Sequence, residues 1–204
     1  MRTSVKRSGF SMIELVFVIV ILGVLAAVAV PRFVATRTDA QVATARSDMA
    51  SAQKAIVAKV FADNIDPTQS NAPDPNKSVA SQGGNFNLNW GDWILQVAGL
   101  DTGRWQKGGK AIGAGVAAVS VDQNDGIQPI GNVKGGQKGG CSAILGIASK
   151  AGGYMVFAPN NIGGDNIDTN NPNSFCAGLR KSYESSGGVG NKVVPLASSG
   201  TVEF

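Results

Sequence analysis

Few side chains in this sequence have the types and spacing that catalysis requires. The chain has 204 residues, including 2 cysteines and no histidine. Without histidine it has neither a Ser-His-Asp triad nor a Cys-His pair. Cys141 and Cys176 alone do not provide the four ligands of a structural zinc site. We therefore expect a protein that is not an enzyme and that needs neither a metal nor a cofactor.

One carboxylate stands in an unusual place. Glu14 is the only charged residue between Phe10 and Val30, a stretch of 21 residues. As a helix this stretch extends about 30 Å, the thickness of the hydrocarbon core of a bilayer. A carboxylate costs about 2.5–3.5 kcal/mol at the bilayer centre and less near its edge. Glu14 therefore either has a polar partner or reaches back to the cytoplasmic interface.

The charges around this stretch predict its orientation. Three of the 18 cations, Arg2, Lys6 and Arg7, precede it, and the chain from Phe10 onward carries 15 cations against 14 acids. A cationic flank stays in the cytoplasm, so the remainder is exported. Cleavage by ordinary signal peptidase after Val30 is disfavoured because Pro31 would follow the cut. A plain single-pass anchor is another interpretation.

A third interpretation explains more of the residues. The sequence from Lys6 to Leu15 (KRSGFSMIEL), the apolar run and Pro31 resemble the class III signal of type IV pilins and type II secretion pseudopilins. That signal has a basic leader, a glycine, a phenylalanine and a glutamate fifth after the cut. Ser11 and Met12 replace the commoner threonine and leucine. The resemblance covers about residues 1–62.

The resemblance implies processing and assembly. In this family a membrane prepilin peptidase cuts after the glycine, here between Gly9 and Phe10, and methylates the new amine of Phe10. Glycine has no side chain, so the scissile bond can lie extended in a protease cleft. The family glutamate, here Glu14, pairs with the N-terminal amine of a neighbouring subunit. Implied partners are the peptidase, other pilin or pseudopilin subunits, an inner-membrane assembly platform and the lipid bilayer.

The elements that position these residues begin with one long helix. After Pro31 apolar residues recur at three- and four-residue steps, and neither glycine nor proline occurs between Arg32 and Asp63, so we expect the helix to continue to about Ala62. Residues 1–9 are a leader that is removed, 10–30 the transmembrane half and 31–62 an amphipathic half. The predicted stripe comprises Val42, Ala45, Met49, Ala52, Ile56 and Val60.

Residues 63–204 are expected to form an exported globular head. The prolines, glycines and polar residues of 63–89 predict a surface connection. The segment Trp90–Leu95 is either helical or strand-like. Short strands are predicted at Val116–Val121, Ala143–Ala148, Tyr154–Ala158 and Lys192–Leu196, with an edge at Thr201–Phe204. Glycine-rich stretches separate them: Gly108–Gly115, Gly131–Gly140 and Gly187–Gly190. The expected fold class is α+β, with a small antiparallel sheet packed on the helix, which is also the pilin arrangement.

The cysteines have an expected role in an exported head. An even pair in an oxidising compartment favours a disulfide between Cys141 and Cys176. Many pilins have a C-terminal region bounded by such a bond, whereas pseudopilins often lack it. A loop of about 35 residues corresponds to about 3–4 kcal/mol in the chain-entropy model. Two buried thiols are the alternative.

Charged loops suggest two further ligands. Residues 102–164 carry a local excess of cations that are candidates for contact with an anion, DNA or an acidic partner: Arg104, Lys107, Lys110, Lys134 and Lys138. Solvated loop faces are the simpler interpretation.

Two loops offer oxygen ligands of the kind that Ca²⁺ prefers, as in some major pseudopilins, although neither matches an EF-hand: Asp122, Asn124, Asp125 and Gly126, and Asp165, Asn166 and Asp168. Ordinary turn chemistry also accounts for these residues.

Together these patterns predict a structural subunit of a type IV pilus-like or type II secretion pseudopilus filament. We expect a single-pass protein of the bacterial inner membrane with its head in the periplasm, serving protein secretion or DNA uptake. The alternatives are a major type IV pilin for adhesion or motility and an exported binding module on an uncleaved anchor. A retained segment Met1–Gly9 would favour the binding module.

Overall fold

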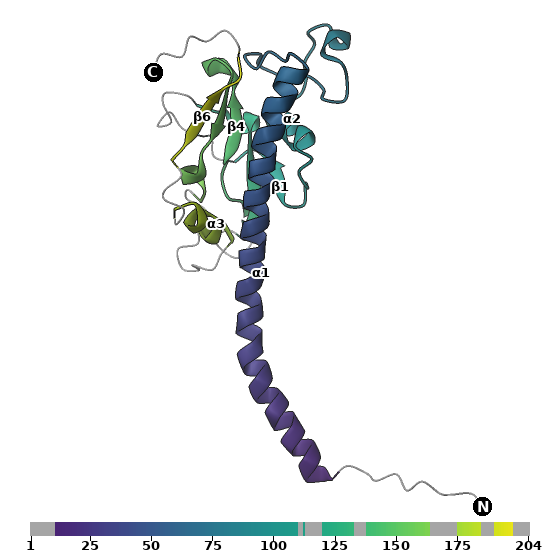
Figure 1. Cartoon of the computed structure of the whole chain (residues 1–204), viewed down its shortest axis with the longest axis vertical. Coiled ribbons are helices and arrows are strands. Elements are labelled where there is room, and N and C mark those ends of the chain that lie inside the picture. The colour runs from purple at the N-terminus through teal and green to yellow at the C-terminus, as the bar shows by residue number, and fades with distance from the viewer. Residues whose placement is uncertain are drawn as a thin grey trace, which may run out of the picture. The chain divides into compact units, whose positions relative to one another are not determined.

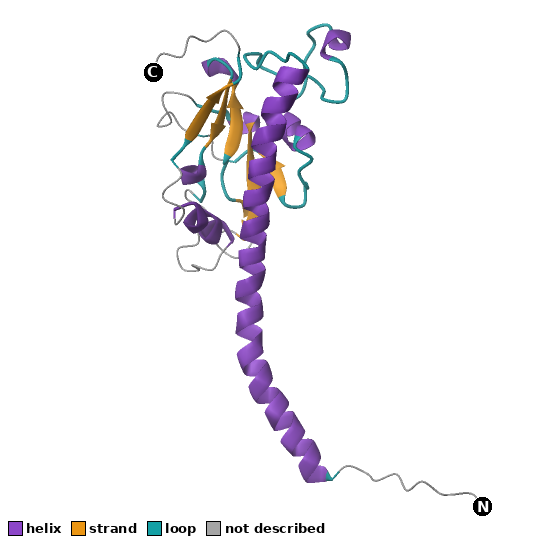
Figure 2. Cartoon of the chain, viewed as in Figure 1, coloured by secondary structure: helices purple, strands orange, loops and turns teal. Residues whose placement is uncertain are grey.

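The computed structural model describes residues 11–109, 112, 120–132, 138–163, 175–184 and 190–197, without the side chains of 30–36, 131–132 and 138. The chain divides into two units, Met1–Arg37 and Thr38–Phe204. Figures 1 and 2 show the helix that runs through both and the helices and strands of the second unit.

The helix α1 extends from Met12 to Ala62, as predicted, and Pro31 does not end it. It ends where Asn64 adopts a left-handed conformation, with φ of 49°. The Ile65 N–H then donates to the Val60 carbonyl at 2.9 Å, which satisfies one of the last carbonyls of the helix. The boundary at Ala62 is therefore set by the local conformation of the residues that follow it.

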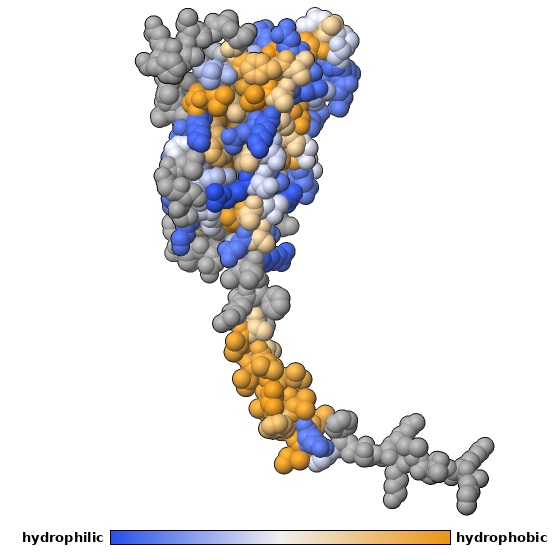
Figure 3. Space-filling model, in the orientation of Figure 1, coloured by the Kyte–Doolittle hydropathy of each residue, from blue (hydrophilic) through white to orange (hydrophobic). Residues whose placement is uncertain are grey.

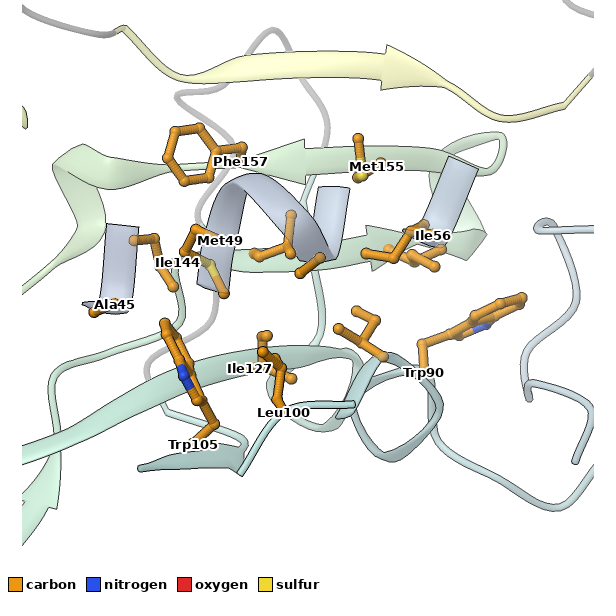
Figure 4. Close-up of a cluster of buried hydrophobic side chains, with 14 of the residues drawn as sticks. Ala45, Met49, Ile56, Trp90, Leu100, Trp105, Ile127, Ile144, Met155 and Phe157 are labelled. Atoms are coloured by element: carbon orange, nitrogen blue, oxygen red, sulfur yellow. The ribbon is translucent and has the colours of Figure 1, made fainter. Parts of the chain in front are cut away.

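The second part of α1 forms the centre of the head core. All six residues of the predicted stripe are buried, from Val42 at 8% exposed to Ile56 at 0%. Figure 4 shows Met49 and Ile56 among side chains from the sheet and among Trp90 and Leu100, which precede the sheet in the chain. The amphipathic half of the helix is thus part of the folded head and contributes much of its apolar interior.

The described residues of the head form a six-stranded antiparallel sheet. Its strands are β1 (Trp105–Lys107), β2 (Gly126–Asn132), β3 (Lys138–Gly140), β4 (Leu145–Ala148), β5 (Tyr154–Phe157) and β6 (Lys192–Pro195). Their order is β1-β2-β4-β5-β6, and β3 pairs with the far end of β2. Because strand side chains alternate between faces, Met155 and Phe157 join the core around α1, whereas Val156 joins a second cluster on the other face. The predicted α+β fold, a helix with an antiparallel sheet head, is confirmed.

Two further helices and four short 3-10 turns complete the described structure. The helix α2 spans Trp90–Val97, so the undecided segment Trp90–Leu95 is helical, and α3 spans Phe175–Glu184. The 3-10 turns are η1 (Val79–Gln82), η2 (Gln123–Asp125), η3 (Ser149–Ala151) and η4 (Pro159–Asn161).

The sequence predicted only part of the sheet correctly. The strands β4, β5 and β6 lie within predicted segments, but β1, β2, β3 and α3 were not predicted. The stretch Gly131–Gly140 was expected to separate strands, yet β2 extends to Asn132 and β3 begins at Lys138. Val121 forms an isolated bridge with Ile112, while most of Val116–Val121 and all of Thr201–Phe204 lie outside the described residues.

The connection 63–89 is closed on itself and is fastened to α2. Ala72 and Leu88, both within it, form an antiparallel bridge that closes its larger loop. The indole Nε1 of Trp90 donates to the Gln69 carbonyl at 2.9 Å. The neighbouring Trp93 is equally buried, but its Nε1 has no acceptor among the described residues.

This difference between the two tryptophans predicts unequal effects of the same substitution. Trp90→Phe and Trp93→Phe remove the same atoms from the same helix, but only the first removes a hydrogen bond. We expect Trp90→Phe to lower the free energy of unfolding by about 1 kcal/mol more than Trp93→Phe. Denaturant titration of both variants in detergent measures the difference. Equal decreases in the free energy of unfolding would show that the hydrogen bond to Gln69 does not stabilise the head.

A second prediction concerns acid stability at the start of this connection. Asp66 accepts hydrogen bonds from Thr68 Oγ1 at 2.6 Å, Gln69 Nε2 at 2.9 Å and Thr68 N at 3.0 Å. These bonds, the one from the Thr68 hydroxyl first, lower the pKa of Asp66 below its ordinary value of 3.8. A carboxyl whose pKa is lower in the folded state stabilises the fold above its unfolded pKa, and this contribution is lost as the pH falls through the folded pKa.

Asp66→Asn should therefore make the loss of stability below pH 3.8 shallower than in the wild type. Unfolding curves in denaturant, collected from neutral pH down into that range, measure the slope. Parallel curves for the two proteins would contradict the prediction.

Candidate processing and assembly site

The first part of α1 is an apolar helix that the described residues of its own chain leave exposed. Met12–Ala29 is the one segment of the described residues that is long and apolar enough to cross a membrane. Its side chains are exposed on every face, with Phe17 at 66% and Leu25 at 61%, and Figure 3 shows this continuous apolar surface. A helix that is apolar all round requires lipid or other helices around it.

Glu14 lies in the first turn of this helix and is exposed. Its carboxylate Oε2 accepts a hydrogen bond from the Ser11 backbone N–H at 2.8 Å. Sequence reasoning did not identify Ser11 as a partner, although the spacing Ser-x-x-Glu at a helix start was a signal for it. Gly9 and Phe10 lie outside the described residues, so cleavage and methylation there stay predictions.

The predicted disulfide joins Cys141 and Cys176, with 5.5 Å between their Cα atoms. Cys141 follows β3, and Cys176 lies in the first turn of α3. Both are fully buried in the main core. The inner face of α3 consists of Cys176, Leu179 and Tyr183, a helical spacing that could have predicted this element.

Polar contacts hold α1 against the rest of the head. Asp48 Oδ2 accepts from Trp105 Nε1 at 2.9 Å and forms an ion pair with Arg104 at 3.3 Å. Arg46 Nη1 donates to the Ser182 carbonyl at 3.2 Å, and its guanidinium lies 5.2 Å from the centre of the Tyr183 ring. Burial raises the pKa of Tyr183. Arg46 and Asp48 stand within one turn of α1, so these contacts tie that turn both to α3 and to the start of β1.

The described residues do not place the candidate DNA-contacting cations together in one surface patch. Arg104 forms ion pairs with Asp48 and Asp101, and Lys107 forms one with Asp92. Lys110, Lys134 and the side chain of Lys138 lie outside the described structure. Contact with DNA or another anion stays a prediction.

The candidate calcium loops have other contacts where they are described. Asp122 forms an ion pair with Lys150, and Asp125, which is buried, accepts from the Trp90 N–H at 3.4 Å. Burial raises the pKa of Asp125. Within the described ranges no group of three or more histidine, cysteine or acidic residues could hold a metal ion. Asp165, Asn166 and Asp168 are outside those ranges, so calcium binding stays a prediction.

Comparison with known proteins bears on the N-terminal residues. A family model described as the prokaryotic N-terminal methylation motif matches residues 5–30. This match includes Gly9, Phe10 and Glu14, and it is the prepilin-type cleavage signal of type IV pilins and pseudopilins. No curated protein and no solved structure matches the chain.

The motif defines the class of the protein more closely than the head does. The resemblance expected from Lys6–Leu15 is confirmed, and it indicates a type IV pilin-like or pseudopilin protein with a structural role. With the apolar helix it also indicates a membrane-anchored protein. The motif implies processing by a prepilin peptidase and assembly with other pilin subunits.

Proposed function

We propose that this protein is a structural subunit of a type IV pilus-like or type II secretion pseudopilus filament, serving protein secretion or DNA uptake. It is assembled from the inner membrane, with its head in the periplasm, after a peptidase cuts between Gly9 and Phe10. The observation that carries the proposal is the methylation motif over residues 5–30 at the start of an apolar, exposed helix.

The physical argument concerns what surrounds Met12–Ala29. In the membrane, lipid covers its apolar side chains, and in a filament the helices of neighbouring subunits take the place of lipid. Because both environments are apolar, the exchange needs little net free energy. Glu14 makes the exchange directional, since its carboxylate costs free energy in lipid and gains an ammonium partner in the filament.

Mass spectrometry of the protein from native membranes tests the processing step. We expect a chain that begins at methylated Phe10 and gains two hydrogens on reduction of the Cys141–Cys176 bond. A chain that still begins at Met1, in cells with an active prepilin peptidase, would overturn the proposal and favour a binding module on an uncleaved anchor.

The assembly step is tested by Glu14→Ala. We expect normal processing, because Glu14 is four residues beyond Phe10 and is not part of the bond that is cut, and loss of incorporation into filaments. Asp39→Ala is the matched control, because Asp39 is an exposed acid of the same helix beyond the membrane span. Normal incorporation of Glu14→Ala would refute the assembly role of this carboxylate.

One observation favours a second candidate, a major type IV pilin for adhesion or motility. The disulfide between Cys141 and Cys176 bounds a C-terminal region as in many pilins, whereas pseudopilins often lack such a bond. Immunogold electron microscopy of intact cells separates the candidates. Label along long surface fibres supports the major pilin, and label confined to the periplasm supports the pseudopilus.

A further inference from the structure

The strands β3 and β4 are two parts of one irregular strand that runs along β2. Gly140 of β3 lies opposite Ile130, and Leu145 of β4 lies opposite Ile127. Three steps along β2 therefore correspond to five steps along the other segment, which contains two residues more than a regular ladder needs. Such an insertion is a β-bulge, a feature that often re-aims a neighbouring side chain. Cys141 follows β3 directly and is the first residue of this bulge.

The bulge comprises residues 141–144, and backbone bonds to β2 hold both of its ends. At its start, the Cys141 N–H donates to the Pro129 carbonyl at 2.9 Å. At its end, the Ile144 N–H donates to the Ile127 carbonyl at 2.9 Å. The residue of β2 between these two acceptors is Gln128, which contacts the middle of the bulge with its side chain. The ends therefore continue the ladder of the sheet, whereas the middle depends on one side chain.

Ser142 is the residue of the bulge with an unusual conformation. Its φ is 77°, a left-handed conformation that costs free energy for a residue with a side chain. Its N–H donates to Gln128 Oε1 at 3.1 Å. Its hydroxyl is buried and has no partner among the described residues, so the hydroxyl does not hold this conformation. The conformation of Ser142 thus depends on the amide of Gln128, which is buried as well.

The bulge begins at the disulfide. Cys141 is bonded to Cys176 of α3, and its carbonyl accepts the Gly163 N–H at 2.7 Å. We infer that Gln128 and Ser142 couple the disulfide to the pairing of the sheet. The bulge that they form holds Cys141 within reach of Cys176, and the closed bond in turn restrains the bulge. A head paired out of register would not close this bond, because one step along a strand turns a side chain to the opposite face.

The coupling acts on the equilibrium between the two thiols and the disulfide. With glutathione disulfide as the oxidant, each cysteine thiol gives its proton to one glutathione sulfur. The S–S bond of glutathione breaks as the bond between Cys141 and Cys176 forms, and two glutathione thiols are released. In the reduced head Cys141 is not tied to α3, so the bulge can relax. A substitution that disfavours the bulge therefore costs more in the oxidised head and lowers the fraction of disulfide. Gln128 and Ser142 are thus positioning residues for this bond.

The oxidation equilibrium of the full chain in detergent, set by mixtures of glutathione thiol and disulfide, tests the coupling. Gln128→Met keeps the length of the side chain but replaces the amide by a thioether, which is only a weak acceptor. The buried Ser142 N–H then loses its partner, and we expect an oxidation equilibrium constant about tenfold lower than in the wild type. Each equilibrium is approached from oxidised and from reduced protein, because both cysteines are buried and exchange slowly.

Trp90→Phe is the matched control for Gln128→Met. It also removes one hydrogen bond of the head, to the Gln69 carbonyl, but that bond involves neither the bulge nor the cysteines. We expect its oxidation constant to stay within about twofold of the wild type. Equal decreases in Trp90→Phe and Gln128→Met would overturn the coupling, because oxidation would then follow the overall stability of the head. An unchanged constant in Gln128→Met would overturn it as well.

A second pair of variants keeps the test decisive if Gln128→Met does not fold. Ser142→Gly and Ser142→Ala both remove the buried hydroxyl, but only glycine adopts a φ of 77° without a steric cost. We expect an oxidation constant about fivefold larger in Ser142→Gly than in Ser142→Ala. Equal constants in these two variants would show that the left-handed bulge is not needed to close the disulfide, and would overturn the coupling.

Discussion

Removing the disulfide should lower the free energy of unfolding of the head by about 3–4 kcal/mol. The expected change is that of the double variant Cys141→Ala and Cys176→Ala, which removes the bond without leaving a thiol. The cysteines are 35 residues apart, and closing a loop of this length in the unfolded chain corresponds to about 3–4 kcal/mol in the chain-entropy model. This loss is a large fraction of the stability of an ordinary domain.

The loss should be uneven across the head. Cys176 is in the first turn of α3, so the bond ties the start of this helix to the end of β3, and the burial of Leu179 and Tyr183 and the contact of Arg46 with the Ser182 carbonyl also hold it. We therefore expect amide protection of α3 to fall more than that of β4 and β5, which form the middle of the sheet.

Reduction provides the control for this experiment. Both sulfurs belong to fully buried residues, so the wild type should keep its bond in mild reductant until the head opens. Once reduced in denaturant, wild type and double variant should unfold at similar concentrations, and reductant should not affect the double variant. Equal stability of the oxidised wild type and the double variant would show that the bond does not constrain the unfolded chain.

The parts of the molecule that the sequence predicted best are those whose signal comes from residues close together in the chain. The stripe from Val42 to Val60 repeats at helical spacing for more than four turns, so its burial required no knowledge of the sheet. The processing residues could also be read directly, because a glycine, a phenylalanine and a lone glutamate stand at fixed distances from an apolar run. Both features depend on residues close together in the chain.

The missed strands depend instead on distant residues. Gln128 is a buried polar residue of β2, and its Oε1 accepts from the Ser142 N–H at 3.1 Å. A Cβ at Gly140, and another at Gly109, would collide with the Gln128 side chain. Gly140 of β3 and Gly109 of the earlier glycine-rich stretch therefore leave the room that the buried Gln128 side chain occupies. No local pattern shows that requirement, and Pro129 further hides β2 as a strand.

The second large effect is expected at Gly91, in the first turn of α2. A Cβ at this position would lie 2.7 Å from the carbonyl oxygens of both Asn124 and Gly126 and 3.0 Å from Cβ of Lys107. Two of these neighbours are backbone atoms of η2 and β2, which cannot turn away as a flexible side chain can. We expect Gly91→Ala to lower the free energy of unfolding by about 1–3 kcal/mol, the usual cost of overpacking.

A matched control exists in the other short helix. Gly178 in α3 faces Val42, and a Cβ there would meet Val42 Cγ2 at 3.4 Å, an ordinary van der Waals contact. Alanine is favoured over glycine in a helix interior by about 0.5–1 kcal/mol, so Gly178→Ala should stabilise the head by about that amount. Denaturant titration of the two variants should therefore give changes of opposite sign. A stabilising Gly91→Ala would mean that α2 can move away from η2 and β2, which would also loosen Trp90 from its contact with Asp125.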